Sequence, residues 1–185
     1  MASLPNSKAV TYEEWLRMPE VHDAIEEVVN GEIRIVPAAK TKHAVIVARA
    51  FRALDGQLDA SRVIVLTGSF GLIIRQSPLT SRVPDLAVCE LATLNEPDGY
   101  IHTAPQLLVE VLSPANSRRE REEKLADYAN LGVPEVWVIS PEARTVEVLY
   151  LEDGFLHSTQ ILARGVLTPR LFPAVSIDIA HIWPD

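Results

Sequence analysis

The spacing of hydrophobic residues along the first third of the chain predicts two helices and a hairpin. A threonine and a glutamate three residues later give capping-box spacing at the start of segment 11–18, which predicts a short helix ended by the proline that follows. Segment 27–36 consists of two β-prone runs around Asn30 and Gly31, which tolerate the positive φ of a tight hairpin turn. Apolar residues then recur at helical spacing over 43–60, which indicates an amphipathic helix.

The rest of the chain is dominated by short apolar runs typical of buried strands. A second capping box, Ser117 with Glu120, predicts one further helix that continues to Leu131 and ends at Gly132. Because strands and this helix follow one another in mixed order, we expect an α/β fold with a central mixed β-sheet flanked by helices, in a single domain over residues 1–185. The predicted strands are 63–66, 71–74, 84–89, 106–112, 135–139 and 145–150.

Glu110 interrupts the most hydrophobic of these strands, which runs from Leu107 to Leu112. Burial of an isolated carboxylate there would cost several kcal/mol in lost hydration. Proteins keep such a group where a cation, a metal ion or a set of hydrogen-bond donors compensates it. Glu110 is therefore the first candidate for a functional residue.

Composition limits the classes of protein to which the chain can belong. With 185 residues, 48% of them hydrophobic and 23% charged, it is typical of a globular protein, and no apolar run approaches the roughly 18 residues of a membrane span. One cysteine excludes an intramolecular disulfide, and residues 1–6 lack the features of a signal peptide, so we expect a cytoplasmic protein. The net charge of −8 argues against a constitutive nucleic-acid binder, but not against an enzyme that contacts nucleic acid locally.

Two further charged residues could meet Glu110 if the predicted strands are neighbours. Asp85 stands at the start of the preceding strand, so the two carboxylates could point to one edge of the sheet and share a divalent ion. Lys124 lies two turns into the following helix, from which its ammonium could reach the same edge. Oxygen ligands of this kind suit Mg²⁺ or Mn²⁺, and two carboxylates, a lysine and a metal ion are the components of phosphodiester hydrolysis.

Four short motifs follow one another along the chain: Pro84-Asp85, the run 109–114 around Glu110, the helical segment 120–128 with Lys124, and the segment 132–137. In this order they resemble the bacterial "putative restriction endonuclease" family of the PD-(D/E)XK nuclease superfamily. The resemblance extends upstream to 27–32 and His43, and so covers most of the chain. The chain departs from the superfamily at Leu112, where a lysine usually stands, and from the family at Glu120, which is frequently Asp.

The resemblance implies a restriction endonuclease-like fold and a role for each candidate residue. It makes Asp85 and Glu110 the metal ligands, with the backbone carbonyl of Val111 as a third, and Mg²⁺ or Mn²⁺ the cofactor. It matches Lys124 to the family's lysine on the following helix and Glu27 to the upstream acid that often completes the superfamily site. The implied substrate is DNA, held by transient local contacts.

Four basic residues are the candidate contacts to substrate phosphates: His43, Arg118, Arg119 and Arg121. His43 could instead cap a helix or be exposed, and the arginines could form a solvated helix face. Lys124 has a comparable alternative, an ion pair with Glu120 one turn earlier.

The two carboxylates also have interpretations without function. Glu110 could form a buried ion pair with Arg34 or Arg75, and Asp85 after a proline could accept a local turn hydrogen bond. Taken together, however, the charged residues favour a site.

We therefore expect a metal-dependent endonuclease that hydrolyses phosphodiester bonds in DNA, without membrane association. Self-association through an exposed strand or the terminal segments could give a homodimer, as is common in the superfamily. A second hypothesis, which the net charge favours, is a non-catalytic interaction or regulatory module that keeps the nuclease fold. A third is a metal hydrolase acting on a small phosphoester.

Overall fold

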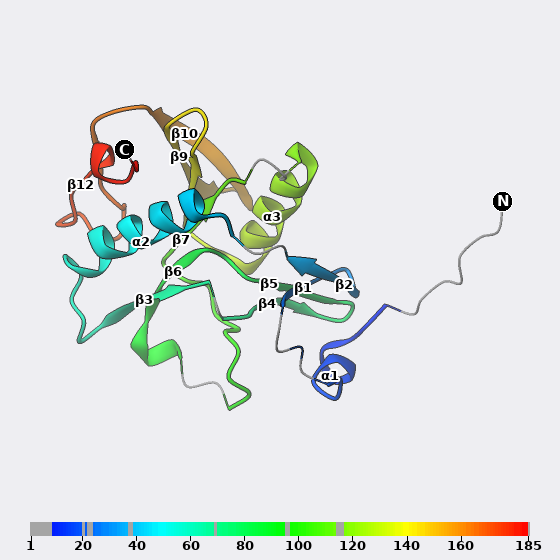
Figure 1. The fold of residues 1–185 in the computed structure, drawn as a ribbon. Coiled ribbons are helices and arrows are strands. Elements are labelled where there is room, and N and C mark those ends of the chain that lie inside the picture. Colours follow the sequence, from blue (N-terminus) through cyan, green and yellow to red (C-terminus); the bar gives the residue numbers. More distant parts are fainter. Residues whose placement is uncertain are drawn as a thin grey trace.

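The computed structural model of the chain describes residues 9–19, 21, 24–36, 39–68, 70–94, 97–113 and 117–184. Its centre is a six-stranded sheet in the order β10-β9-β8-β7-β6-β3 (Figure 1). The pair β7–β8 is parallel and the other pairs are antiparallel, so the sheet is mixed as predicted. The strands are β3 (Val63–Thr67), β6 (Leu86–Glu90), β7 (Leu107–Val111), β8 (Glu135–Ser140), β9 (Thr145–Glu152) and β10 (Phe155–Leu162).

A second, four-stranded antiparallel sheet lies beside the first, in the order β2-β1-β5-β4. Its β1–β2 hairpin confirms the predicted turn, since Asn30 and Gly31 have φ values of 53° and 80°. Strand β5 was not predicted, because its short and partly polar sequence lacks the apolar run of a buried strand, yet all four of its residues are buried. The strands are β1 (Ile25–Val29), β2 (Glu32–Val36), β4 (Leu72–Gln76) and β5 (Leu79–Arg82).

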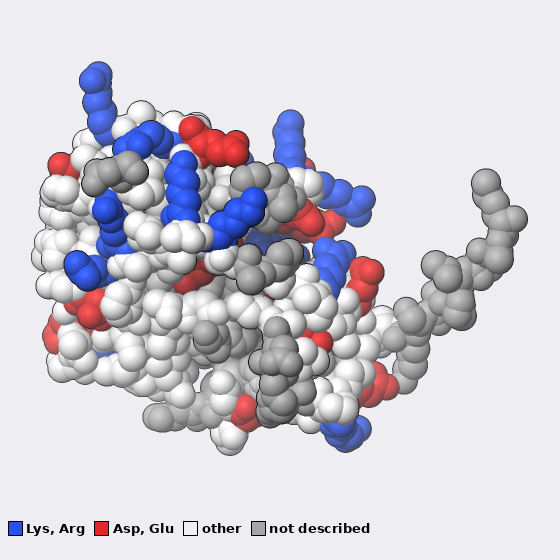
Figure 2. All heavy atoms as spheres, in the orientation of Figure 1, with Lys and Arg blue, Asp and Glu red and all other residues white. Residues whose placement is uncertain are grey.

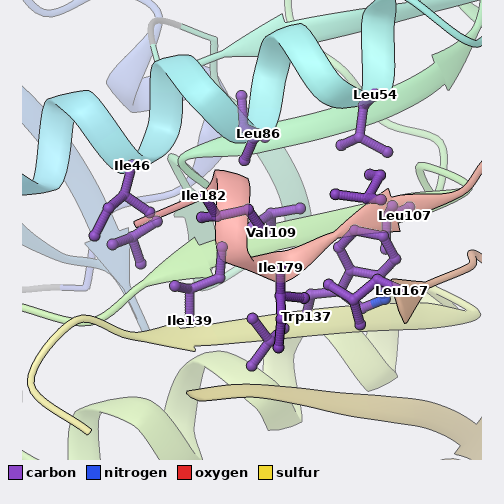
Figure 3. Close-up of a cluster of buried hydrophobic side chains, with 14 of the residues drawn as sticks. Ile46, Leu54, Leu86, Leu107, Val109, Trp137, Ile139, Leu167, Ile179 and Ile182 are labelled. Carbon is purple, nitrogen blue, oxygen red and sulfur yellow. The ribbon is translucent and has the colours of Figure 1, made fainter. Parts of the chain in front are cut away.

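Helices cover both faces of the six-stranded sheet. Helix α2 (Thr41–Asp55) and the segment 167–183 pack on one face, where Leu54, Leu86 and Trp137 are among the buried side chains (Figure 3). Helix α3 (Arg118–Leu131) packs on the other face around Tyr128. No helix in the described part of the chain is long and apolar enough to cross a membrane.

The predicted helices exist, with different ends. Helix α1 (Tyr12–Trp15) has the predicted capping box but is only one turn long. Helix α2 begins two residues before the predicted start and ends at Asp55 instead of 60, where Gly56 forms its C-cap and its N–H donates to the carbonyls of Arg52 and Leu54. The capping box of α3 and its end at Gly132, with φ of 91°, are as predicted.

Several segments beyond the predicted ones are ordered. The most extended is β10, whose eight residues carry no Asp, Glu, Lys or Arg and whose outer edge has no neighbouring strand in the described sheet. The remaining elements are the short pair β11 (Val166–Leu167) and β12 (Ile177–Asp178) and the 3-10 turns 91–93 and 179–181.

The homodimer and the single-domain organisation stay predictions, and β10 provides the exposed strand that pairing between two copies would require. The N-terminal residues 1–6 and part of the motif 109–114 lie outside the described residues.

A hydrogen-bonded cluster holds α1 against the loop after β6. The Tyr12 hydroxyl donates to Asp98 Oδ2 at 2.6 Å, and His102 Nε2 lies 2.9 Å from the same oxygen. From the sequence, the acids of the loop 94–100 are alternative metal ligands. Asp98, however, is engaged here and lines neither hollow of the candidate site described below, and Glu96 lies outside the described residues.

This cluster predicts a specific pH dependence of stability. The hydrogen bond from Tyr12, with others from the Tyr100 N–H and His102, lowers the pKa of Asp98 to about 2, against about 4 in an unfolded chain. The ionised carboxylate therefore stabilises the fold fully above about pH 4, and this contribution is lost as the pH falls toward 2. Urea unfolding should show Asp98→Asn less stable than the wild type at pH 7, with the difference shrinking between pH 4 and 2. A difference that stays constant over this range would contradict the assignment, and Asp153→Asn at an exposed turn is the control.

Candidate functional site

The pairing of β6 with β7 brings the two predicted metal ligands together. Leu86 lies opposite Val109 in this antiparallel pair. Asp85 immediately precedes β6 and Glu110 immediately follows Val109, so the two residues lie side by side at the same end of this strand pair, and both line one hollow. Asp85 does not accept a local turn hydrogen bond, because its Oδ2 accepts instead from the N–H of Val111, 26 positions away, at 2.7 Å.

Glu110 is compensated by two side chains of α3. Its carboxylate is only 13% exposed, and both of its oxygens lie 3.3 Å from Lys124 Nζ. The Tyr128 hydroxyl, fully buried, donates to Glu110 Oε1. Burial raises the pKa of Glu110 above its ordinary value. The positive charge of Lys124 acts to lower this pKa, whereas the negative charge of Asp85 acts to raise it further. The buried carboxylate thus has both a cation and a hydrogen-bond donor.

The alternative ion pair of Glu110 with Arg34 or Arg75 is wrong. Arg34 pairs with Glu123 at 3.3 Å, and Arg75 donates to the side chain of Asn30. Both arginines belong to the four-stranded sheet, whereas the groups that contact Glu110 come from α3, directly above its strand.

Lys124 is not a solvated surface lysine. Its side chain is 22% exposed, and its Nζ lies 3.0 Å from Glu27 Oε1 in addition to its contacts with Glu110. Burial by itself would disfavour the ammonium, but Glu110 and Glu27 raise the pKa of Lys124 above its ordinary value. The alternative pair with Glu120 does not form, because that carboxylate accepts from Ser117 and completes the helix cap.

Glu27 belongs to a buried ion network that links β1, β5 and α3. Arg82, only 3% exposed, donates from Nη1 to Glu27 Oε2 at 2.9 Å and from Nε to Asp127 at 2.8 Å. Glu27 Oε1 also accepts from the N–H of Val83 at 3.2 Å. Although burial alone would raise the pKa of Glu27, Lys124 and Arg82 lower it. Glu27 therefore remains ionised, with donors on both oxygens.

His43 contacts the site from the first turn of α2. Its Nε2 lies 3.3 Å from Asp85 Oδ2, and its side chain is mostly buried, so it is neither exposed nor the helix cap. The hydrogen bond to Asp85 raises the pKa of His43 above its ordinary value. Burial acts to lower this pKa, and a hydrogen bond with the backbone of Val111 acts to raise it. Its Nδ1 is buried without a hydrogen-bond partner among the described residues.

Two hollows meet at the Glu110–Lys124 pair, which lines both. The larger, of about 440 Å³, also has Asp85, His43, Lys40 and Lys42 in its wall. The smaller, of about 150 Å³, lies on the side of Glu27, Arg34, Arg82 and Arg121. The carboxylates that could bind a metal are thus open to the larger hollow.

The three arginines of α3 occupy different positions relative to these hollows. Arg118 and Arg119 are 92% and 87% exposed, and each pairs with a glutamate one turn later. Arg121 lines the smaller hollow and pairs with Glu147. In the view of Figure 2, most Lys and Arg side chains stand on the upper half of the molecule, which carries α2 and α3 in Figure 1. This face of the molecule thus carries many basic side chains despite the negative net charge.

The donor set fits a hard divalent cation. Two largely buried carboxylates, one just before β6 and one on β7, repel each other, and an ion of opposite charge between them would remove that repulsion. Among the described residues no group of three or more His, Cys, Asp and Glu side chains is arranged to hold a metal. An ion here would thus bind Asp85 and Glu110, with water and backbone oxygen completing its shell, as Mg²⁺ prefers. The Val111 carbonyl stays a prediction as the third ligand.

Sequence reasoning missed several residues around this site. Arg82 and Asp127 were not predicted as site residues. Both are charged and close in sequence to predicted ones, since Arg82 stands two residues before Pro84 and Asp127 three residues after Lys124. Tyr128 was not among the predicted site residues; it is buried in the core, and its hydroxyl holds Glu110. Lys40 and Lys42, at the start of α2, were also not predicted, although both line the larger hollow.

Comparison with known proteins identifies a protein family and a similar solved structure. Residues 12–180 match the sequence model of the Uma2 family, described as "Putative restriction endonuclease". The crystal structure of a protein from Anabaena variabilis, described as a putative nuclease belonging to DUF820, is similar with a TM-score of 0.77. The two sequences are 20% identical, and the match covers 94% of this chain and 97% of that one. No curated protein matches the chain. These findings confirm the predicted restriction endonuclease-like fold.

The buried network around Arg82 should be essential for stability. Arg82→Met would leave Glu27 and Asp127 without their shared cation, and loss of one partner of a buried pair costs roughly 3–5 kcal/mol. Arg118→Met removes an arginine that pairs with Glu122 in solvent and should therefore destabilise the protein much less than Arg82→Met. Urea unfolding of both variants measures the difference, and equal stabilities would refute the structural role of Arg82.

Proposed function

Since this chain belongs to the Uma2 family of putative restriction endonucleases, we propose that it is a metal-dependent endonuclease hydrolysing phosphodiester bonds in DNA. The observation that carries this proposal is the arrangement of Asp85 and Glu110 on adjacent strands, with Lys124 against Glu110 and a hollow beside them. These are the groups that metal-assisted hydrolysis of a phosphodiester requires.

Asp85 and Glu110 would hold the ion, which is Mg²⁺ or Mn²⁺. When bound, this ion supplies Lewis-acid stabilisation of negative charge on the phosphate. His43 keeps Asp85 in place through its 3.3 Å contact, and Tyr128 does the same for Glu110. Both carboxylates are therefore oriented before any substrate arrives, which limits the reorganisation needed during the reaction.

Lys124 contributes a fixed positive charge at the wall of the larger hollow. Because its partners Glu110 and Glu27 favour the ammonium, Lys124 acts as a cation that stabilises developing charge and positions the attacking water. Glu27 assists indirectly, since it holds the ammonium and is itself held by Arg82.

The substrate would be held by basic residues on both sides of the hollow. Lys40 and Lys42 line it from α2, and Lys42 Nζ donates to the carbonyl of Pro141 at 3.2 Å. On the side of α3, the predicted phosphate contacts are Arg118, Arg119 and Arg121. So few basic groups fit local, transient contact with DNA and agree with a net charge of −8.

Metal binding and cleavage should depend on the same two carboxylates. Asp85→Asn and Glu110→Gln should each weaken Mn²⁺ binding in calorimetry and abolish Mg²⁺-dependent cleavage of plasmid and single-stranded DNA. The loss should exceed the roughly 10–100-fold typical of groups that only support a ligand. Glu90→Gln, at the exposed far end of the Asp85 strand, is the matched control.

The pattern of results separates the competing functions. Unchanged Mn²⁺ binding in both variants would refute the site. Metal binding without cleavage of any DNA would favour the interaction module. Cleavage of bis(p-nitrophenyl) phosphate but of no DNA would favour a hydrolase of small phosphoesters.

The lysines of α2 should affect binding through electrostatics alone. If Lys40 and Lys42 each contact one phosphate, alanine at either position should lower the slope of log Kd against log salt by about 0.9 for duplex DNA, or about 0.7 for single strands. Fluorescence anisotropy of a labelled oligonucleotide without added metal measures this slope. Arg62→Ala, at the opposite end of the strands from Asp85, should leave the slope unchanged. An unchanged slope in both lysine variants would remove α2 from the binding surface.

A further inference from the structure

We propose that Lys124 takes the place of a second metal ion, so that the chain binds one divalent cation at Asp85 and Glu110 and none between Glu110 and Glu27. The inference rests on the proposed function, which supplies the first ion. It sets the number of metal ions bound by the site at one per chain.

The ammonium of Lys124 lies where a bridging cation would lie. Its Nζ is 3.0 Å from Glu27 Oε1 and 3.3 Å from both oxygens of Glu110, so one positive charge serves carboxylates from two different sheets. The surrounding side chains are mostly buried, and solvent alone would compensate the two carboxylates poorly.

Glu27 has no oxygen left without a donor. Oε1 accepts from Lys124 and from the Val83 N–H, and Oε2 accepts from Arg82 at 2.9 Å. Unlike Glu110, Glu27 does not line the larger hollow that contains Asp85, and it is also held by the buried Arg82. With its side chain only 7% exposed, Glu27 is therefore a positioning residue for Lys124 and not a metal ligand. This differs from the resemblance, by which Glu27 completes the site as an upstream acid.

The charge of the cluster matches one divalent ion. The cluster contains four carboxylates and two permanent cations, and His43 lies beside them. The net charge of the cluster is −2 when His43 is neutral and −1 when His43 is protonated. With the histidine neutral, one divalent cation neutralises that charge, whereas a second would leave an excess of two positive charges in a largely buried cluster. The groups counted are Glu27, Asp85, Glu110 and Asp127 against Arg82 and Lys124.

Removing the lysine charge should therefore create a second site. Lys124→Met keeps an unbranched side chain of similar length but leaves Glu27 and Glu110 facing each other. Calorimetric titration with Mn²⁺ should give one ion per chain for the wild type and two for Lys124→Met. The double variant Lys124→Met/Glu27→Gln should return to one ion, because only one carboxylate remains at the new position. Lys42→Met removes a lysine from the same hollow without touching these carboxylates and should keep one ion.

Glu27→Gln alone provides a test that does not depend on the folding of Lys124→Met. If Glu27 only positions the lysine, this variant should still bind one Mn²⁺, with Kd within about threefold of the wild type, and circular dichroism checks its fold. Loss of the ion would make Glu27 a ligand and overturn the inference.

The outcomes separate this inference from the proposed function. Two ions in the wild type with intact cleavage would overturn the inference and leave the nuclease standing. A single ion in Lys124→Met would also overturn it. No ion in the wild type would refute both.

Discussion

The ion pairs of Lys124 connect the parts of this molecule. Glu27 belongs to β1 of the four-stranded sheet, Glu110 to β7 of the six-stranded sheet, and the ammonium that contacts both comes from α3. A carboxylate on a strand buried on both faces is costly unless a cation reaches it. Since this cation comes from the helix that joins β7 to β8, the fold and the candidate site depend on the same interaction.

A second layer of charges fixes the position of that lysine. Arg82 lies between Glu27 and Asp127, so β5 and α3 are joined by a buried cation one step away from the site. In our inference, this network makes Glu27 the group that holds Lys124. It also leaves Asp85 and Glu110 as the carboxylates open to the larger hollow, while polar side chains on either side hold them in place.

Much of the site could be predicted because its residues lie on regular, consecutive elements. Asp85 and Glu110 stand at matching ends of strands that follow one another, and the cap at Ser117 sets the phase of the helix that carries Lys124. Strand β5 could not be predicted, because it is buried by contacts with a sheet partner remote in sequence and not by an apolar pattern of its own. The same applies to Arg82, whose partners are 55 and 45 positions away.

The sequence by itself determined the mixed α/β fold, the caps and turns, and the two carboxylates with their lysine, because these depend on local spacing and on the cost of a charge in an apolar strand. Only the tertiary structure decided what each charge contacts. Glu110 meets Lys124 and Tyr128 and not an arginine, Glu27 is saturated by donors, and the lysines of α2 reach the hollow. The physical reason is that ion pairs form between side chains that the packing of sheets and helices brings within about 4 Å, and sequence spacing does not report that distance.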